Sequence, residues 1–240
     1  MRRRTLINKK RREIVKERFD EFFLSVGYEW KSHDGFYFYY KRGEGKTDIC
    51  VLGFAYSGAV EIKVSERLVT LDEVEQYVKK MYPDYKSYSD ARTFYLDDLY
   101  WPTIRDTSLG NKDFLDWGIK TRFSTLNAID LFCENYFTYY FETAQEVIEN
   151  YSNLPRLLLR MEEYRDEMPG SEICPLCGKQ ADLCELIISR LCGDPNSTKL
   201  LEVYEKKRSS VKNNKVSQHP PIERVREVLE NIRPMYNVLN

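Results

Sequence analysis

Apolar residues recur at strand spacing between residues 28 and 69, and this pattern predicts an antiparallel sheet. Aromatic residues that favour strands fill positions 36–40. A polar turn at 43–46 separates them from a second predicted strand over 47–52. Residues 60–64 alternate apolar with charged side chains, which predicts a third, half-buried strand.

The turn at 43–46 sets the pairing of the first two strands. A four-residue loop places Lys41 opposite Asp48 and Phe38 opposite Val51, and the opposite charges favour that register. Alternation then sorts the side chains onto two faces. We expect the first face to form the core, with Phe38 buried; it carries Phe36, Phe38, Tyr40, Ile49, Val51, Val60, Ile62 and Val64. The second face is aromatic and charged, and we look for function there; it carries Tyr37, Tyr39, Lys41, Asp48, Cys50, Leu52, Glu61 and Lys63.

The connection before the third strand allows two registers. A two-residue turn at 57–58 pairs Tyr56 with Ala59, whereas a six-residue loop at 53–58 pairs Leu52 with Ala59. The registers differ by an even shift, so both keep the same faces. We favour the tight turn, because Phe54 and Tyr56 extend the alternation. Asp48 then lies opposite Arg67 and forms a surface ion pair with Lys41.

Helical periodicity flanks the predicted sheet. An apolar stripe at helical spacing predicts a helix over 10–26. Thr70 and Glu73 form a capping box for a second helix, which ends before Pro83. A further strand is expected at 93–96. The order of elements is therefore α-β-β-β-α-β.

The rest of the chain has helical patterns. The longest predicted helix covers 126–151, and Pro155 suits the first turn of the next one. We expect an α+β fold, an antiparallel β-meander with flanking helices. A boundary at residue 170 gives an α+β domain, 1–170, and a small helical C-terminal region, 171–240. Three helices are expected in that region, near 181–192, 197–208 and 221–233, with a flexible link at 209–218.

Composition narrows the classes of partner. The chain of 240 residues has 37 basic and 38 acidic residues, so its overall charge gives no reason to expect nucleic acid. No apolar run approaches the roughly 20 residues that a membrane span needs. The basic start continues into charged residues instead of the apolar segment of a signal peptide. We therefore expect a cytoplasmic protein with reduced cysteines and no membrane partner.

The most motif-like stretch is Cys174-Pro-Leu-Cys177, which resembles half of a zinc ribbon. A structural zinc site needs two more ligands, and Cys184 and His219 are the candidates. Cys192 cannot join Cys184, because a continuous helix would separate them by roughly 12 Å. Free cysteines are often small core residues, so we expect buried thiols without metal, and zinc is the alternative.

Asp48, Glu61 and Lys63 resemble the Asp…Glu-x-Lys signature of the restriction-endonuclease-like nuclease superfamily, over about residues 10–98. The resemblance implies that the two carboxylates hold Mg²⁺ and that the lysine orients the attacking water. Thr47 stands where that signature usually has proline. The site closes only with the six-residue loop, because the tight turn leaves Asp48 roughly 20 Å from Glu61.

A second resemblance covers residues 10–165. Gly27-Tyr28-x-Trp30-Lys31 before an aromatic strand, then Trp117-Gly118-Ile119 and a helix near Leu154-Pro155, resemble small bacterial α+β domains. Some of those domains lie beside toxin systems as immunity-like proteins, and no catalytic motif defines them. The resemblance implies protein binding without catalysis or a cofactor.

The first functional hypothesis is therefore a non-enzymatic cytoplasmic protein that binds a protein partner. Its contact residues would be the aromatic side chains of the second face: Tyr37, Tyr39, Phe54 and Tyr56. The alternative is a metal-dependent nuclease with Asp48, Glu61 and Lys63 as catalytic residues, and only this alternative involves nucleic acid.

Overall fold

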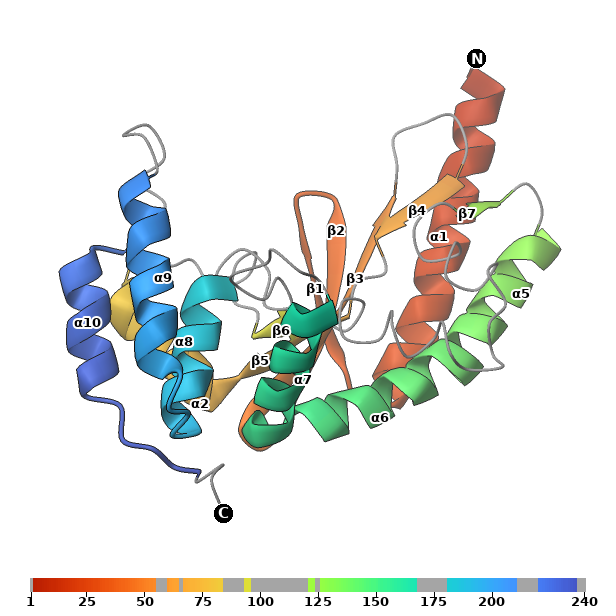
Figure 1. Cartoon of the computed structure of the whole chain (residues 1–240). Coiled ribbons are helices and arrows are strands. Elements are labelled where there is room, and N and C mark those ends of the chain that lie inside the picture. Colours follow the sequence, from red (N-terminus) through yellow and green to blue (C-terminus); the bar gives the residue numbers. More distant parts are fainter. Residues whose placement is uncertain are drawn as a thin grey trace. The chain divides into compact units, whose positions relative to one another are not determined.

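The computed structural model describes residues 2–54, 60–64, 67–83, 93–95, 121–123, 126–167, 181–210 and 220–236 (Figure 1). It has the expected α+β class, with an antiparallel sheet and flanking helices. The chain forms two compact units, one of Met1–Leu68 with Leu99–Ile148 and one of Val69–Asp98 with Glu149–Asn240. Each unit consists of two separate segments of the sequence. The expected division at residue 170 stays a prediction.

The first unit contains the sheet, whose strands follow the order β1-β2-β3-β4-β7. These strands are β1 (Glu29–His33), β2 (Phe36–Arg42), β3 (Lys46–Phe54), β4 (Val60–Val64) and β7 (Thr121–Phe123). The sequence pattern missed β1, because its residues are mostly polar and all five are exposed. Asp34 and Gly35 join β1 to β2 in a tight turn with positive φ angles of 50° and 80°.

The predicted register between β2 and β3 is confirmed. Lys41 lies opposite Asp48, and Phe38 lies opposite Val51. The backbone N–H of Gly43 donates to the carbonyl of Lys46 at 2.8 Å, which closes the expected four-residue turn.

Both predicted registers between β3 and β4 are wrong. Gly53 lies opposite Val64, and Phe54 lies opposite Ile62, with an irregularity between the two pairs. The favoured tight turn would have placed Phe54 opposite Glu61. A bulge explains the difference, since one extra residue shifts the pairing by one position. Residues 55–59, which hold the connection, lie outside the described part of the chain.

The second face of the sheet is the buried one, so the predicted choice of face is wrong. Helix α1 (Arg2–Ser25) and the helical segment after β7 pack against it. In this core, the rings of Phe23 and Tyr39 stack with centroids 4.8 Å apart. The buried cluster consists of Val15, Phe19, Phe23, Tyr28, Tyr39, Cys50, Leu52, Ile129, Phe132, Cys133 and Tyr136.

The first face is only partly covered. Phe36, Phe38, Tyr40 and Ile49 are half-buried, and Val51 alone among the described members of this face is buried. Phe36 lies directly over Gly53, where an added Cβ would come within 2.6 Å of its ring. The absence of a side chain at Gly53 therefore lets an aromatic ring pack flat on the sheet.

The predicted long helix over 126–151 is interrupted. It consists of α5 (Leu126–Asn135), a π-helix η1 (Tyr136–Tyr140) and α6 (Phe141–Tyr151). Phe137 and Phe141 both pack on Phe22 of α1, with ring centroids 4.1 and 4.9 Å away. A π-turn holds an extra residue, which changes the direction of the following side chains.

The second unit is mainly helical. Its helices are α2 (Asp72–Met81), α7 (Leu154–Glu167), α8 (Ala181–Leu191), α9 (Ser197–Ser210) and α10 (Ile222–Glu230). The strand β5 (Arg67–Leu71) leads into α2 and pairs with β6 (Phe94–Tyr95). The predicted cap at Thr70 is wrong, since α2 begins after Leu71 without a side-chain cap. The expected link at 209–218 falls mostly outside the described residues.

The assignment of the faces predicts different costs for two phenylalanine truncations. Phe19→Ala should lower the free energy of unfolding by about 3–5 kcal/mol, because Phe19 is fully buried among five other rings. Phe38→Ala should cost about half as much, because Phe38 is half-buried. Urea denaturation of both variants measures this, and an equal or greater loss for Phe38→Ala would contradict the assignment.

Candidate functional site

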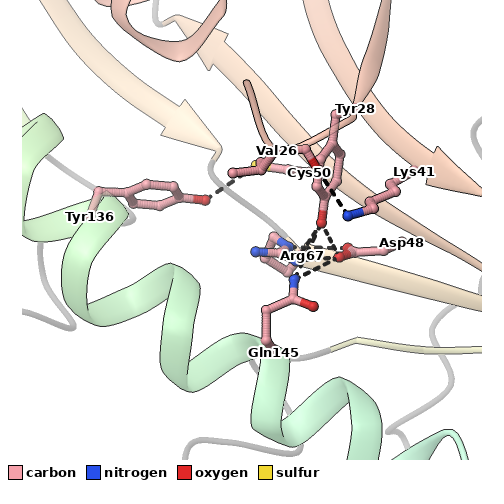
Figure 2. Close-up of polar contacts among 8 residues, drawn as sticks. All are labelled: Val26, Tyr28, Lys41, Asp48, Cys50, Arg67, Tyr136 and Gln145. Carbon is pink, nitrogen blue, oxygen red and sulfur yellow. Dashed lines mark hydrogen bonds and ion pairs between the residues drawn. The ribbon is translucent and has the colours of Figure 1, made fainter. Parts of the chain in front are cut away.

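A buried ion pair lies on the second face of the sheet (Figure 2). Asp48 sits in β3 with 6% of its surface exposed, and Arg67 at the start of β5 is fully buried. The Nε of Arg67 donates to Oδ1 of Asp48 at 3.2 Å, and Nη2 donates to Oδ2. The guanidinium thus holds the carboxylate through two parallel bonds, the strongest geometry for such a pair.

Two further side chains complete the cluster around Asp48. The hydroxyl of Tyr28 donates to Oδ2 of Asp48 and accepts a bond from Nη2 of Arg67 at 3.1 Å. Gln145 of α6 donates from Nε2 to Oδ2 of Asp48 at 3.1 Å. The network therefore joins four segments that lie far apart in the sequence (Figure 2).

The end of α1 positions Tyr28. Gly27 adopts a positive φ of 84°, which an L side chain rarely tolerates, and ends the helix as predicted. The backbone N–H of Tyr28 then donates to the carbonyl of Phe23 at 2.9 Å. Tyr28 is thereby turned back under the helix and toward Asp48.

Burial and charge fix the protonation of this cluster. Burial lowers the pKa of Arg67, but the facing Asp48 and Tyr28 outweigh it, and the net pKa lies above its ordinary value. Burial raises the pKa of Tyr28 above its ordinary value; Arg67 opposes this shift, and Asp48 adds to it. Arg67 therefore stays charged and Tyr28 stays neutral, while the ring of Phe141 lies 4.8 Å from the guanidinium.

These contacts make the cluster a structural anchor. Three residues donate hydrogen bonds to the Asp48 carboxylate, which leaves it little capacity to bind a metal ion. Next to it, the thiol of Cys50 lies 3.2 Å from the hydroxyl of Tyr136, which ties β3 to the π-helix. Tyr28, Asp48 and Arg67 are buried and bonded to one another, whereas Nη1 of Arg67 has no hydrogen-bond partner among the described residues.

The predicted catalytic residues are not brought together. Phe54 lies opposite Ile62, so Asp48 and Glu61 are seven positions apart along the strands, or about 23 Å. The side chains of Glu61 and Lys63 lie outside the described part of the structure. The expected surface ion pair between Asp48 and Lys41 is also wrong, because the ammonium of Lys41 donates to the carbonyl of Val26 at 2.9 Å.

The predicted contact residues do not form an open surface. Tyr39 is fully buried and donates to Asp20 of α1 at 2.9 Å. Tyr37 and Phe54 are half-buried and pack against the same core. The ammonium of Lys16 lies 4.8 Å from the ring centroid of Tyr37. Tyr39 is therefore inaccessible to a partner, and Tyr37 and Phe54 lie on the face that α1 covers. Tyr56 lies outside the described residues.

The proposed zinc ligands can be placed only in part. Cys184 is buried in α8, where burial and then the nearby Glu75 raise its pKa well above the ordinary value. Cys174, Cys177 and His219 lie outside the described residues. Among the described residues, no group of three or more His, Cys, Asp or Glu side chains could hold a metal ion.

The second unit contains a buried carboxylate that sequence reasoning missed. Glu75 of α2 is 5% exposed, and neither of its oxygens has a hydrogen-bond partner within the described structure. Burial raises its pKa to about 7, an effect that Lys79 opposes and Asp72 reinforces. An acidic residue on the buried side of a helix is the signal that could have drawn attention to it.

Sequence reasoning placed Arg67 opposite Asp48 only through a register that is wrong, and it missed their ion pair and the roles of Tyr28 and Gln145. Arg67 is the one charged residue in a strand that otherwise reads Leu-Val-Thr-Leu. Because a buried charge is costly without an opposite charge, such a residue indicates a buried partner. Tyr28 and Gln145 gave no comparable signal, since both residue types are common on surfaces.

Comparison of the chain with family models, with curated proteins and with solved structures found no match. None of the described helices is both long enough and apolar enough to cross a membrane.

The ion pair predicts an asymmetric response to mutation. Asp48→Ala should lower the free energy of unfolding by about 3–5 kcal/mol, because it leaves the Arg67 charge buried without a partner. Asp48→Leu and Arg67→Met should each be destabilising because each leaves one buried charge unpaired, and the double variant should cost less than the sum of these two single changes. Glu13→Ala, which breaks the exposed pair with Lys9, should cost under about 1 kcal/mol. Additive losses in a double-mutant cycle would contradict the pairing.

Glu75 predicts a pH dependence of stability. Its pKa in the folded protein, about 7, lies above the ordinary 4.5, so the folded state keeps a proton that the unfolded state releases. The stabilisation by neutral Glu75 is complete below about pH 4.5 and is lost as the pH rises through 7, by roughly 3 kcal/mol. Glu75→Gln should flatten this part of the profile, and an unchanged slope between pH 5 and 8 would refute it.

Proposed function

We propose that this chain is a non-enzymatic cytoplasmic protein that binds a protein partner through the first face of its sheet. The observation that supports this proposal is a row of half-buried aromatic side chains on that face. We call Phe36, Phe38 and Tyr40, together with the neighbouring Ile49, the aromatic face. Aromatic residues are enriched at protein interfaces, where they supply large contact areas at low entropic cost.

Charged residues border Tyr40, and we assign them to the rim of the interface with Tyr40 inside that rim. Its hydroxyl donates to Glu29 at 2.8 Å, and Lys31 and Arg42 lie 5.4 and 5.8 Å from the centroid of its ring. All three charged residues are exposed. An apolar strip with a charged border is the usual anatomy of a protein-binding surface.

The opposite face supports the choice of surface. Helix α1 and the α5–η1 segment fill it, so the aromatic residues of the second face contribute to stability. The Asp48 cluster is likewise occupied by its own partners, and the nuclease hypothesis has no described geometry in its favour. The first face is thus the part of the described sheet best suited to a partner.

Affinity capture with quantitative mass spectrometry tests the proposal. Tagged wild-type chain should enrich a partner, and Tyr40→Ala should weaken its binding at least tenfold, as loss of a central aromatic contact does. Tyr77→Ala is the matched control, because it removes an equally half-buried tyrosine from α2. Titration of the purified partner against the wild type, Tyr40→Ala and Tyr77→Ala then gives the three dissociation constants.

Equal affinity of the wild type and Tyr40→Ala would reject the aromatic face as the contact surface. Failure of the wild type to capture any partner would reject the proposed function as a whole.

A further inference from the structure

The strand β1 is an edge of the sheet among the strands that the structure describes. Among the described strands it lies at the end of the order β1-β2-β3-β4-β7, and it pairs there with β2. All five of its residues are exposed. The outer side of an edge strand carries N–H and C=O groups that can pair with another chain.

The sequence of β1 is complementary to itself. Glu29 and Lys31 flank Trp30, and both charged side chains lie on the same face of the strand. If two copies of β1 pair antiparallel about Trp30, each Glu29 lies opposite Lys31 of the second copy. Opposite charges placed directly across from each other stabilise such a pair. A pairing centred on Lys31 would instead oppose two lysines, which is unfavourable.

Trp30 adds an apolar contact at the centre of this arrangement. Its side chain is 39% exposed, and the ammonium of Lys16 holds the ring at 3.6 Å from its centroid. In the pairing about Trp30, the two indoles lie directly opposite, and aromatic pairs across strands are stabilising. A lysine on an edge strand usually discourages pairing, but in this register Lys31 faces the opposite charge of Glu29.

We propose that β1 pairs with β1 of a second copy and joins two sheets in a symmetric dimer. The twofold axis passes through Trp30, so both copies use the same surface. Because residues opposite each other share a face, the two aromatic faces lie on the same side of the joined sheet. This inference goes beyond the proposed function, since it concerns association of the chain with itself.

Charge exchange tests the register directly. Sedimentation equilibrium should show that the wild type dimerises, and that Glu29→Lys and Lys31→Glu each weaken dimerisation at least about tenfold by opposing like charges. An equimolar mixture of the two single variants should recover much of the dimerisation. In the mixed dimer, Lys introduced at position 29 of one copy faces Glu introduced at position 31 of the other. The second facing pair keeps its native Glu29 and Lys31. The double variant Glu29→Lys with Lys31→Glu should also dimerise, because it reverses both facing pairs.

Glu44→Lys is the matched control, since it makes the same charge change at an exposed position of the β2–β3 turn. It should dimerise like the wild type, and circular dichroism confirms that each variant is folded. A monomeric wild type would overturn the proposal. So would single variants that still dimerise, or a mixture or double variant that stays monomeric. Partner capture is measured separately with the wild type and Tyr40→Ala, so the dimer and the proposed function can fail independently.

Discussion

The buried charge of Asp48 constrains the whole first unit. A carboxylate removed from water must be neutralised and fully hydrogen-bonded, or the fold loses several kcal/mol. Arg67, Tyr28 and Gln145 meet that requirement from the start of β5, the end of α1 and the side of α6. Because these segments are distant in sequence, the cluster forms only when helix and sheet are correctly assembled. We infer that it favours one arrangement of the unit over others.

This constraint also decides which face of the described sheet is packed against helices and which is only partly covered. Asp48, Cys50 and Leu52 point to the side where α1 packs, so the alternate side chains of β2 and β3 point away from it. The aromatic face thus results from the same alternation that builds the core. Its half-buried rings, held on a sheet whose other side is packed, form the rigid surface that we propose for a partner.

The β2–β3 hairpin followed from the sequence, whereas the buried face and the β3–β4 register did not. The turn at 43–46 and the charges of Lys41 and Asp48 were sufficient to predict the β2–β3 register. The buried face could not be predicted, because both faces of β2 carry aromatic residues and the choice depends on where α1 packs. The β3–β4 register failed for a similar reason, since a bulge leaves no mark in the alternation. The strand β1 was missed because an exposed edge needs no apolar pattern.

The two faces of β2 differ in exposure, and hydroxyl-radical footprinting of the intact chain measures this difference residue by residue. Phe38 and Tyr40 should be oxidised readily, whereas Tyr39 between them should be protected beneath α1, where it donates to Asp20. All three residues lie in one short peptide, so their rates are compared within the same sample. Oxidation of Tyr39 as fast as that of Tyr40, or faster, would contradict the assignment of the faces and the contact surface that depends on it.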